Sequence, residues 1–261
     1  MDDLKTGIVE KYREERLNQT VYDGERSNKH KVSPATVNKE VSTLKRMYNL
    51  AIREDLATKN PCWKVERLPE NNERKRILSQ EELDRLLSEL PQHAQDIVHS
   101  AYFTGMRAGE IYKLTWNKVI LAEGYLQLEA EDTKTKEPRR IYFNDVLLES
   151  MTRLNKVRYI PHDYVFTYKG KPIKSIKTCL RNACQEAKIE DFRFHHDLHH
   201  TYNTMMRKAG VQKSVIMKMT GHKTSAMFDR YNTVDEEDAK EALKKLDKFL
   251  ESKGKEEAEG D

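Results

Sequence analysis

The chain has 261 residues, 37% hydrophobic and 34% charged, which suffices for one large or two modest domains with a densely ionic surface. Residues 235–261 hold eleven acidic and six basic side chains, a net charge of −5, so the rest of this +4 chain carries +9. A basic body with an acidic tail indicates a polyanionic partner. No apolar run approaches the ~18 residues of a membrane span, which excludes an integral membrane protein of the helical class.

Residues 1–68 are predicted to form a helical domain. Ser33-Pro34 is a strong helix start, because serine caps the helix and proline suits its first position. Apolar residues then recur at helical spacing and define a buried face: Val37, Val41, Leu44, Tyr48 and Ala51. Lys39, Lys45 and Arg46 lie on the other faces of this helix. They form either an ordinary solvated face or a basic surface that follows DNA phosphates.

Residues 69–78 are predicted to be a linker, since Pro69 is followed by charges and amides without an apolar period. The linker ends in a basic run, in which Arg74, Lys75 and Arg76 are candidate phosphate contacts.

A second domain is expected over residues 79–234. Ser79 and Glu82 have the spacing of a capping box, and the leucines that follow form an apolar stripe. Residues 119–143 are predicted to hold three short antiparallel strands, with a turn at Glu123-Gly124 and another in the Lys-Thr-Lys-Glu-Pro segment. Helices resume near Asp145. The expected fold is therefore mainly α with one small three-stranded antiparallel sheet.

The acidic tail, residues 235–261, carries a narrow apolar stripe that includes Leu243, Leu246 and Leu250. A helix with so narrow a stripe at a chain end commonly packs on another surface, and we expect a contact between subunits.

The cysteines Cys62, Cys179 and Cys184 are odd in number, and the N-terminal MDDLKTG lacks the features of a signal peptide. Both observations favour a reducing, intracellular compartment. The familiar phosphate-binding glycine motifs are missing from the sequence. The candidates for chemistry are therefore basic groups, histidines and one tyrosine.

Four segments stand in order along the chain: TGMRAGE (104–110), TKTKEPRR (133–140), HDLHHT (196–201) and GHKTSAMFDRY (221–231). Together they resemble the tyrosine site-specific recombinases, or phage integrase family, over most of the chain. The resemblance implies a helical core-DNA-binding domain followed by a recombinase catalytic domain. It also implies a cytoplasmic, nucleoid-associated protein encoded by a bacterium, an archaeon or a phage.

The resemblance assigns Tyr231 as the nucleophile and Arg107 as the first arginine that holds the phosphate. Lys134, preferred to Lys136, matches the lysine that protonates the leaving 5′ oxygen. His196 opens the histidine box, and His222 is the second histidine. These residue types suit the chemistry: a tyrosine oxygen forms a 3′-phosphotyrosine, and fixed cations stabilise the charge on the phosphate oxygens. Because the ester keeps the bond energy, neither a cofactor nor a metal is expected.

The stretch FHHDLHHTY (194–202) holds four histidines, and a zinc site is the rival interpretation. No cysteine pair stands at a recognised ligand spacing, so we expect no metal here. The resemblance instead turns His196 and position 199 toward the phosphate, while His200 packs and His195 serves local structure. Position 199 departs from the family pattern, because arginine is expected and His199 is present. A histidine is shorter and mostly neutral at pH 7, which predicts reduced activity.

The sequence therefore predicts a DNA recombinase for the integration or excision of a mobile element. Its partners are double-stranded DNA and, by the resemblance, three further copies of itself in a tetrameric synaptic complex. Two alternatives stay open at this point: a DNA-binding relative that no longer cuts, and a metal-dependent nuclease.

Overall fold

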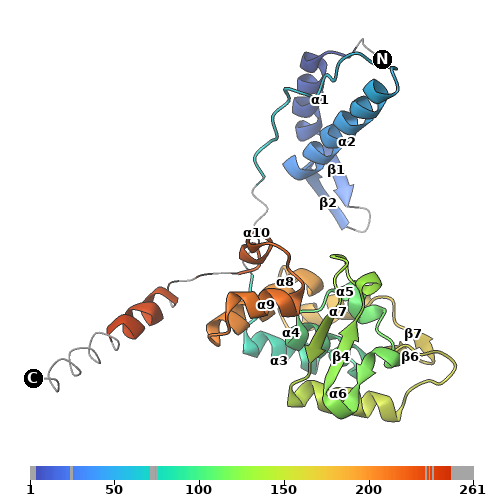
Figure 1. Ribbon diagram of the computed structural model, residues 1–261, viewed down its shortest axis with the longest axis vertical. Coiled ribbons are helices and arrows are strands. Elements are labelled where there is room, and N and C mark those ends of the chain that lie inside the picture. The colour runs from blue at the N-terminus through green and yellow to red at the C-terminus, as the bar shows by residue number, and fades with distance from the viewer. Residues whose placement is uncertain are drawn as a thin grey trace, which may run out of the picture. The chain divides into compact units, whose positions relative to one another are not determined.

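The computed structural model describes residues 4–23, 26–70, 74, 76–232, 234, 236 and 238–247, with no side chains described between 22 and 29. The chain divides into two compact units, residues 1–74 and residues 75–261 (Figure 1).

The described residues of the first unit form two helices and a hairpin. Helix α1 (Thr6–Asn18) leads into strands β1 (Thr20–Asp23) and β2 (Arg26–Lys31), which pair antiparallel, and α2 (Pro34–Arg53) follows. The sequence pattern predicted helices in this domain and did not predict the hairpin. Residues 26–31 read RSNKHK, which lacks the apolar alternation that identifies a half-buried strand.

Helix α2 follows its sequence signals. The Ser33 hydroxyl accepts a hydrogen bond from the Thr36 amide at 3.2 Å, and Pro34 occupies the first helical position. Tyr48 and Ala51 are buried and form a small core with Ala57. The predicted apolar face of this helix is therefore the face that packs within the first unit.

The second unit holds a three-stranded antiparallel sheet of β3 (Val119–Ile120), β4 (Tyr125–Leu128) and β5 (Arg139–Tyr142), with β4 in the middle. Tyr125 pairs with Tyr142, and Gly124 makes the predicted turn with a left-handed backbone, φ +66°. The mainly α fold with this small sheet is confirmed. A two-stranded ribbon of β6 (Thr167–Tyr168) and β7 (Lys171–Pro172) was not predicted.

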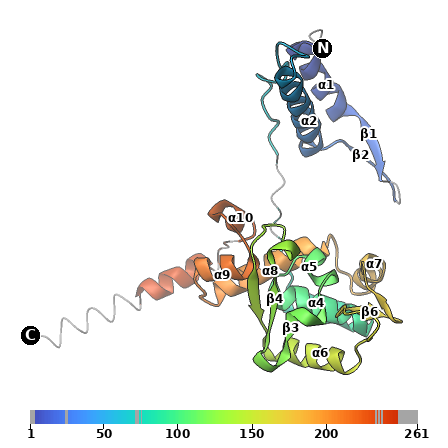
Figure 2. The same ribbon diagram turned by 45° about the vertical axis from the view of Figure 1, so that its right-hand side comes forward.

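Helices make up most of the second unit (Figures 1 and 2). They are α3 (Gln80–Ser88), α4 (Gln92–Thr104), α5 (Ala108–Tyr112), α6 (Asp145–Lys156), α7 (Lys177–Glu186), α8 (Phe194–Lys208), α9 (Lys213–Thr220) and α10 (Ser225–Asp229). Helix α3 begins with the predicted capping box, in which Ser79 and Glu82 bond each other's backbone amides. Helix α8 packs against α4 and α9, and its His199 and His200 are buried.

The described part of the tail, residues 238–247, is helical, and its Leu243 and Leu246 are 61% and 50% exposed. Leu250, the remaining member of the predicted stripe, lies outside the described residues. Among the helices that the structure describes, none has the length and apolar character needed to cross a bilayer.

Candidate active site

Helix α8 positions the histidine-rich stretch at one side of the second unit. His199 and His200 are buried, whereas the side chain of His196 is 32% exposed. The Asp197 carboxylate accepts a hydrogen bond from the Arg193 amide at 2.8 Å, which fixes the first turn of the helix. His195 accepts a bond from the Ala108 amide at 3.4 Å through Nδ1 and so joins α8 to the start of α5.

His199 is only 2% exposed, and both of its ring nitrogens have partners. Its Nδ1 lies 2.5 Å from the carbonyl oxygen of Gly105, and its Nε2 lies 3.0 Å from Nε2 of His222. Gly105 ends helix α4 with a left-handed backbone, and a Cβ there would lie 2.6 Å from the Tyr202 ring. Glycine is therefore what lets this carbonyl meet the imidazole.

His222 follows Gly221, which ends helix α9 with a left-handed backbone. The Nδ1 of His222 lies 2.8 Å from the Thr220 hydroxyl, and that hydroxyl also lies 2.8 Å from the carbonyl oxygen of Ile216. The ring is 5% exposed. The two histidines that the sequence places 23 positions apart thus form one buried, hydrogen-bonded pair.

The ring of Tyr231 lies among these imidazoles. Its centroid is 4.8 Å from that of His199, 5.3 Å from that of His222 and 5.4 Å from that of His196, and it stacks on His222. Helix α10 holds Tyr231 in place, because Thr224 caps the helix and Phe228 is buried beneath it.

The residues after Tyr231 are tied back to α8. Arg207 donates to the side-chain oxygen of Asn232 at 2.6 Å and to both carboxylate oxygens of Asp238 at 2.8 and 2.7 Å. A bidentate pair of this kind fixes both position and orientation. Arg207 therefore anchors the segment that carries Tyr231.

Arg107 stands at the start of α5, next to Gly105. Its Nη1 is buried 3.6 Å from the Glu110 carboxylate and makes no hydrogen bond among the described residues. Glu110 instead bonds the Arg107 amide at 2.8 Å and the guanidinium of Arg139 at 2.7 Å. Arg139 also donates to the carbonyl oxygen of Met219 at 3.0 Å. The carboxylate thus neutralises Arg139 more closely than Arg107.

Three imidazoles of the site have lowered pKa values. Burial lowers the pKa of His222 to about 4, with further lowering by the charges of Arg107 and Arg139. Burial likewise lowers the pKa of His199 well below its usual value, and the neighbouring His222 adds to this. Burial, followed by the charge of Arg107, also lowers the pKa of His195. These three imidazoles are therefore uncharged at neutral pH in the free protein.

Lys134 is exposed in the turn that precedes β5, and its charge contributes to the lowered pKa of His195. Lys136, two residues later, is also exposed and has a left-handed backbone, φ +59°. The structure thus brings Arg107, His196, His199, His222 and Tyr231 together, with Lys134 on the adjoining turn. Among the described residues, no set of three or more side chains is arranged to hold a metal ion.

The predicted DNA contacts are more dispersed. Lys39 and Arg46 are on α2, and the Lys45 ammonium lies 5.3 Å from the centroid of the Trp63 ring. Arg74 is half-buried. Arg76 binds Glu82 at 2.8 Å within the second unit. Lys75 lies outside the described residues.

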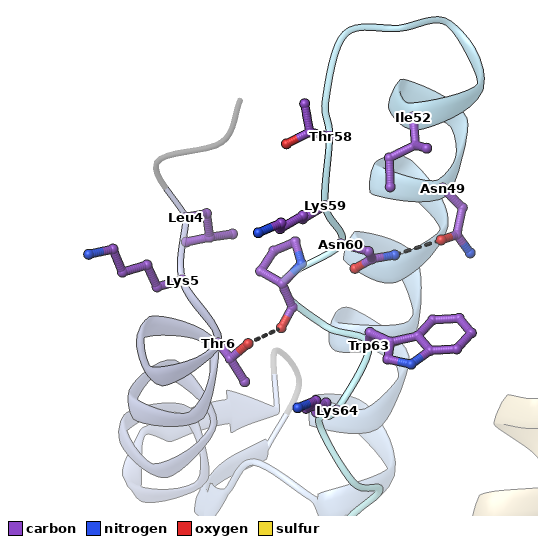
Figure 3. A pocket seen from close by; sticks show the side chains of 11 residues that line it. Leu4, Lys5, Thr6, Asn49, Ile52, Thr58, Lys59, Asn60, Trp63 and Lys64 are labelled. Carbon is purple, nitrogen blue, oxygen red and sulfur yellow. Dashed lines mark hydrogen bonds between the residues drawn. The ribbon is translucent and has the colours of Figure 1, made fainter.

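A pocket of about 710 Å³ opens in the first unit, beside the exposed Trp63 (Figure 3). Lys5, Lys59 and Lys64 line it, and Thr6 bonds the carbonyl of Pro61 across it at 2.9 Å. The residues that the sequence predicts for DNA binding or chemistry lie elsewhere than in its lining.

Three residues of the cluster were missed by the sequence analysis: Glu110, Arg139 and Thr220. Glu110 and Arg139 lie within the quoted motifs, and this position in the motifs was the available signal. Thr220 carries no such signal, because a threonine before Gly-His is indistinguishable from any helix-end threonine.

Comparisons with known proteins identify the family of the chain. The model of the Phage integrase family matches residues 75–238. The integrase of Salmonella phage P22 is 30% identical over 212 residues, which are 76% of this chain and 53% of that protein, so the chain spans about half of that relative. The tyrosine recombinase XerC of Bacillus subtilis (strain 168) is 28% identical over 224 residues, covering 79% of this chain and 72% of that protein.

The fold has counterparts among solved structures. The Tn1549 transposon integrase (aa 82–397), solved in complex with circular intermediate DNA, superposes with a TM-score of 0.71. It is 18% identical, and the match covers 93% of this chain and 85% of that chain. At this identity the likeness concerns the fold.

Proposed function

The chain belongs to the phage integrase family, and from this premise we propose that it is a site-specific DNA recombinase that cleaves and rejoins strands through Tyr231. The observation that carries the proposal is the position of the Tyr231 ring, within 5.4 Å centroid to centroid of three imidazoles that belong to the same cluster as Arg107. Arg107, His196, His199, His222 and Tyr231 come from three of the four sequence motifs.

In the proposed reaction the Tyr231 oxygen attacks the scissile phosphorus and its proton passes to solvent. The bond to the 5′ oxygen breaks, and that oxygen takes a proton from Lys134 and leaves as a hydroxyl. The product is a 3′-phosphotyrosine, from which the reverse reaction rejoins strands without an external energy source. The exposed turn that carries Lys134 suits a group that must reach the DNA.

Arg107 is proposed to bind the non-bridging phosphate oxygens. Its buried Nη1 has no hydrogen-bond partner among the described residues, and an incoming phosphate supplies one. Glu110 leaves this cation available because it pairs more closely with Arg139. His196, whose ring lies 5.4 Å from that of Tyr231 centroid to centroid, is proposed to donate to the same phosphate.

His199 is proposed to lower the rate at neutral pH. It stands where the family pattern has arginine, and in the free protein its burial disfavours the charged form. Loss of one preorganised donor to a developing oxyanion typically costs a factor of about 10²–10³. The second candidate function follows from this same position: a relative that binds DNA without cutting it.

The proposed partners are duplex DNA and further copies of the chain. Lys39, Lys45 and Arg46 on α2, with the basic run at residues 74–76, are proposed to contact phosphates. The exposed Leu243 and Leu246 are proposed to dock on a neighbouring subunit in a tetramer that joins two DNA sites. The proposed cellular role is integration or excision of a mobile element.

The test uses the duplex that the protein itself selects from a random-sequence pool, with a nick beside the mapped binding centre to trap cleavage. Incubation in EDTA is expected to yield a covalent protein–DNA adduct, which is absent in Tyr231→Phe while DNA binding is kept. Specific binding without an adduct, even after long incubation across pH ~6 to ~8, contradicts strand cleavage and favours the non-cutting relative. Cleavage that depends on added Mg²⁺ indicates a nuclease.

A further inference from the structure

A continuous chain of hydrogen-bonding groups runs through the buried pair of histidines. It starts at the Gly105 carbonyl, passes through both nitrogens of His199 and both of His222, and reaches the Thr220 hydroxyl and finally the Ile216 carbonyl. The four separations are 2.5, 3.0, 2.8 and 2.8 Å. Both ends are backbone carbonyl oxygens, which only accept hydrogen bonds.

When both imidazoles are neutral, this row of hydrogen-bonding groups has more donor–acceptor links than hydrogen atoms to fill them. Each of the four links requires one hydrogen between its two heavy atoms. A neutral histidine supplies one hydrogen, and a hydroxyl supplies one, so His199, His222 and Thr220 together supply three. One further proton on the histidine pair completes every link. The geometry is therefore that of a pair built to carry one shared proton.

We infer that His199 and His222 take up one shared proton when a DNA phosphate enters the site, and that this proton supplies the positive charge missing at position 199. The inference rests on the proposed function, because it takes a phosphodiester of DNA as the ligand. The proton comes from solvent when DNA binds and returns to solvent when DNA leaves, so the protein gains one positive charge only in the complex.

The groups that face the pair explain why the proton is absent without DNA. Arg107 at the start of α5 and Arg139 on β5 repel it, while Glu110 balances Arg139 most closely. His195 and His196 belong to the same helix as His199, and His200 faces the Tyr231 ring, which also covers His222. The charge of Lys134 contributes to the lowered pKa of His195.

Burial and the two arginines lower the pKa of His222 to about 4, so the free pair is neutral at physiological pH and one link lacks its hydrogen.

A phosphate reverses this balance. Bound to Arg107, the anion neutralises the cation that repels the extra proton, and its own negative charge attracts that proton. The apparent pKa of the pair must then rise on binding, and by linkage the affinity for the phosphate must increase as the pH falls. The pair thus differs from an arginine in one respect: its charge depends on both pH and DNA.

The test measures protons exchanged on DNA binding. The Tyr231→Phe protein, which cannot react and lacks the phenol, is titrated calorimetrically with its selected duplex in buffers of different ionisation enthalpy. The same titration is done with the His199→Asn variant, which is described below. The difference in proton uptake between the two proteins is expected to rise toward about one per protein as the pH falls from about 7 to about 6. Nitrogen-15 NMR of the imidazoles then identifies which rings gain the proton.

Two variants test the mechanism. Thr220→Val removes the hydroxyl hydrogen and the two links that involve Thr220. Two neutral histidines then supply the two hydrogens that the two remaining links need. The proton uptake is therefore expected to fall. His199→Asn keeps a donor toward Gly105 but cannot titrate, and it is expected to abolish the extra proton. The matched control is His195→Asn, which keeps an acceptor for the Ala108 amide and lies outside the chain of hydrogen bonds, and its uptake is expected to match the parent.

The outcomes separate the inference from the function. If the protein selects no DNA, the proposed function is wrong. If DNA binds and the parent takes up no more protons than His199→Asn, or if Thr220→Val takes up as many as the parent, the shared proton is wrong and the function stands.

Discussion

Two sets of cations in this protein have opposite surroundings. Lys39 and Arg46 stand on α2 of the first unit, and Lys39 is exposed. In the second unit Arg139 is buried with two partners, and Arg107 is 16% exposed beside a carboxylate. Exposed charges are screened by salt and act additively on a polyanion, whereas buried charges keep a fixed geometry in a medium of low dielectric constant.

The difference indicates two separate roles, one in DNA binding and one in the reaction. Solvent-exposed cations suit non-selective attraction to a phosphate backbone, since each contributes a small part of the binding free energy. Charges held in a fixed geometry suit the stabilisation of one developing negative charge, because they need no reorganisation during the reaction. The following predictions test this difference in roles, from the largest expected effect to the smallest.

Salt should act mainly through the exposed cations. If six or more phosphates are contacted, affinity for the selected duplex should fall by about 10³ or more between ~50 and ~200 mM salt. Fluorescence anisotropy over a salt series measures the slope, and Lys39→Ala should make it shallower by about 0.9, the share of one phosphate. An affinity that hardly changes with salt argues against phosphate binding by this surface.

The buried arginines should differ from each other. Arg107→Ala is expected to slow adduct formation on the nicked duplex by about 10²–10³, with duplex affinity and thermal stability nearly unchanged. The reason is that its proposed partner, the phosphate, is present only in the complex.

Arg139→Ala is the matched variant. It leaves the buried Glu110 without its closest cation, and removal of one partner of such a pair typically costs about 3–5 kcal/mol of folding stability. Chemical denaturation measures this cost. Equal decreases in stability in the two variants contradict the distinction between a functional and a structural arginine.

His199→Arg is expected to speed adduct formation at pH 7 by about 10², because it replaces a pH-dependent charge by a permanent one. The gain should shrink as the pH falls toward ~6, where the wild-type pair acquires its own proton in the complex. Single-turnover rates measured across this range provide the test. A gain that is independent of pH, or no gain in a variant of normal stability, refutes the account of position 199.

Acid should destabilise the free protein through the same pair. The pKa of His222 is about 4 in the folded protein, and His199 is also lowered, against ~6.5 in an unfolded chain. Below pH ~6.5 the unfolded chain therefore binds protons that the folded protein does not bind. The free energy of unfolding decreases as the pH is lowered, until the pKa of the folded protein is reached. Each residue contributes at most about 1.4 kcal/mol per pH unit.

Denaturant titrations of the wild type and of the double variant His199→Asn, His222→Gln give this contribution by difference. A double variant that is destabilised as much by acidification as the wild type contradicts the lowered pKa values.

The smallest expected effect concerns the tail. Replacing Leu243 and Leu246 by serine should leave binding to one duplex unchanged, because these exposed side chains are not among the proposed phosphate-binding residues. Assembly on two duplexes should weaken by roughly 30-fold, since the two replacements together remove roughly 2 kcal/mol of apolar burial at an interface. Sedimentation of the protein with paired sites measures this assembly, and an unchanged distribution removes the docking role.

The sequence by itself determined the local features of this protein. The cap at Ser33, the capping box at Ser79 and Glu82 and the turn at Gly124 follow from preferences within a few residues, and the structure contains each of them. The order of the four motifs identified the family, and the family model confirms it. The hairpin at residues 20–31 escaped prediction because its second strand lacks an apolar alternation.

Only the tertiary structure decided how the cluster is connected. His199 meets a carbonyl 94 positions earlier and an imidazole 23 positions later, and Arg139 meets a carboxylate 29 positions earlier. No local preference encodes such pairings, because they arise when α4, α8, α9 and β5 pack and exclude water. That exclusion also keeps the histidines neutral, since the cost of burying a charge depends on the folded surroundings and not on the residue type.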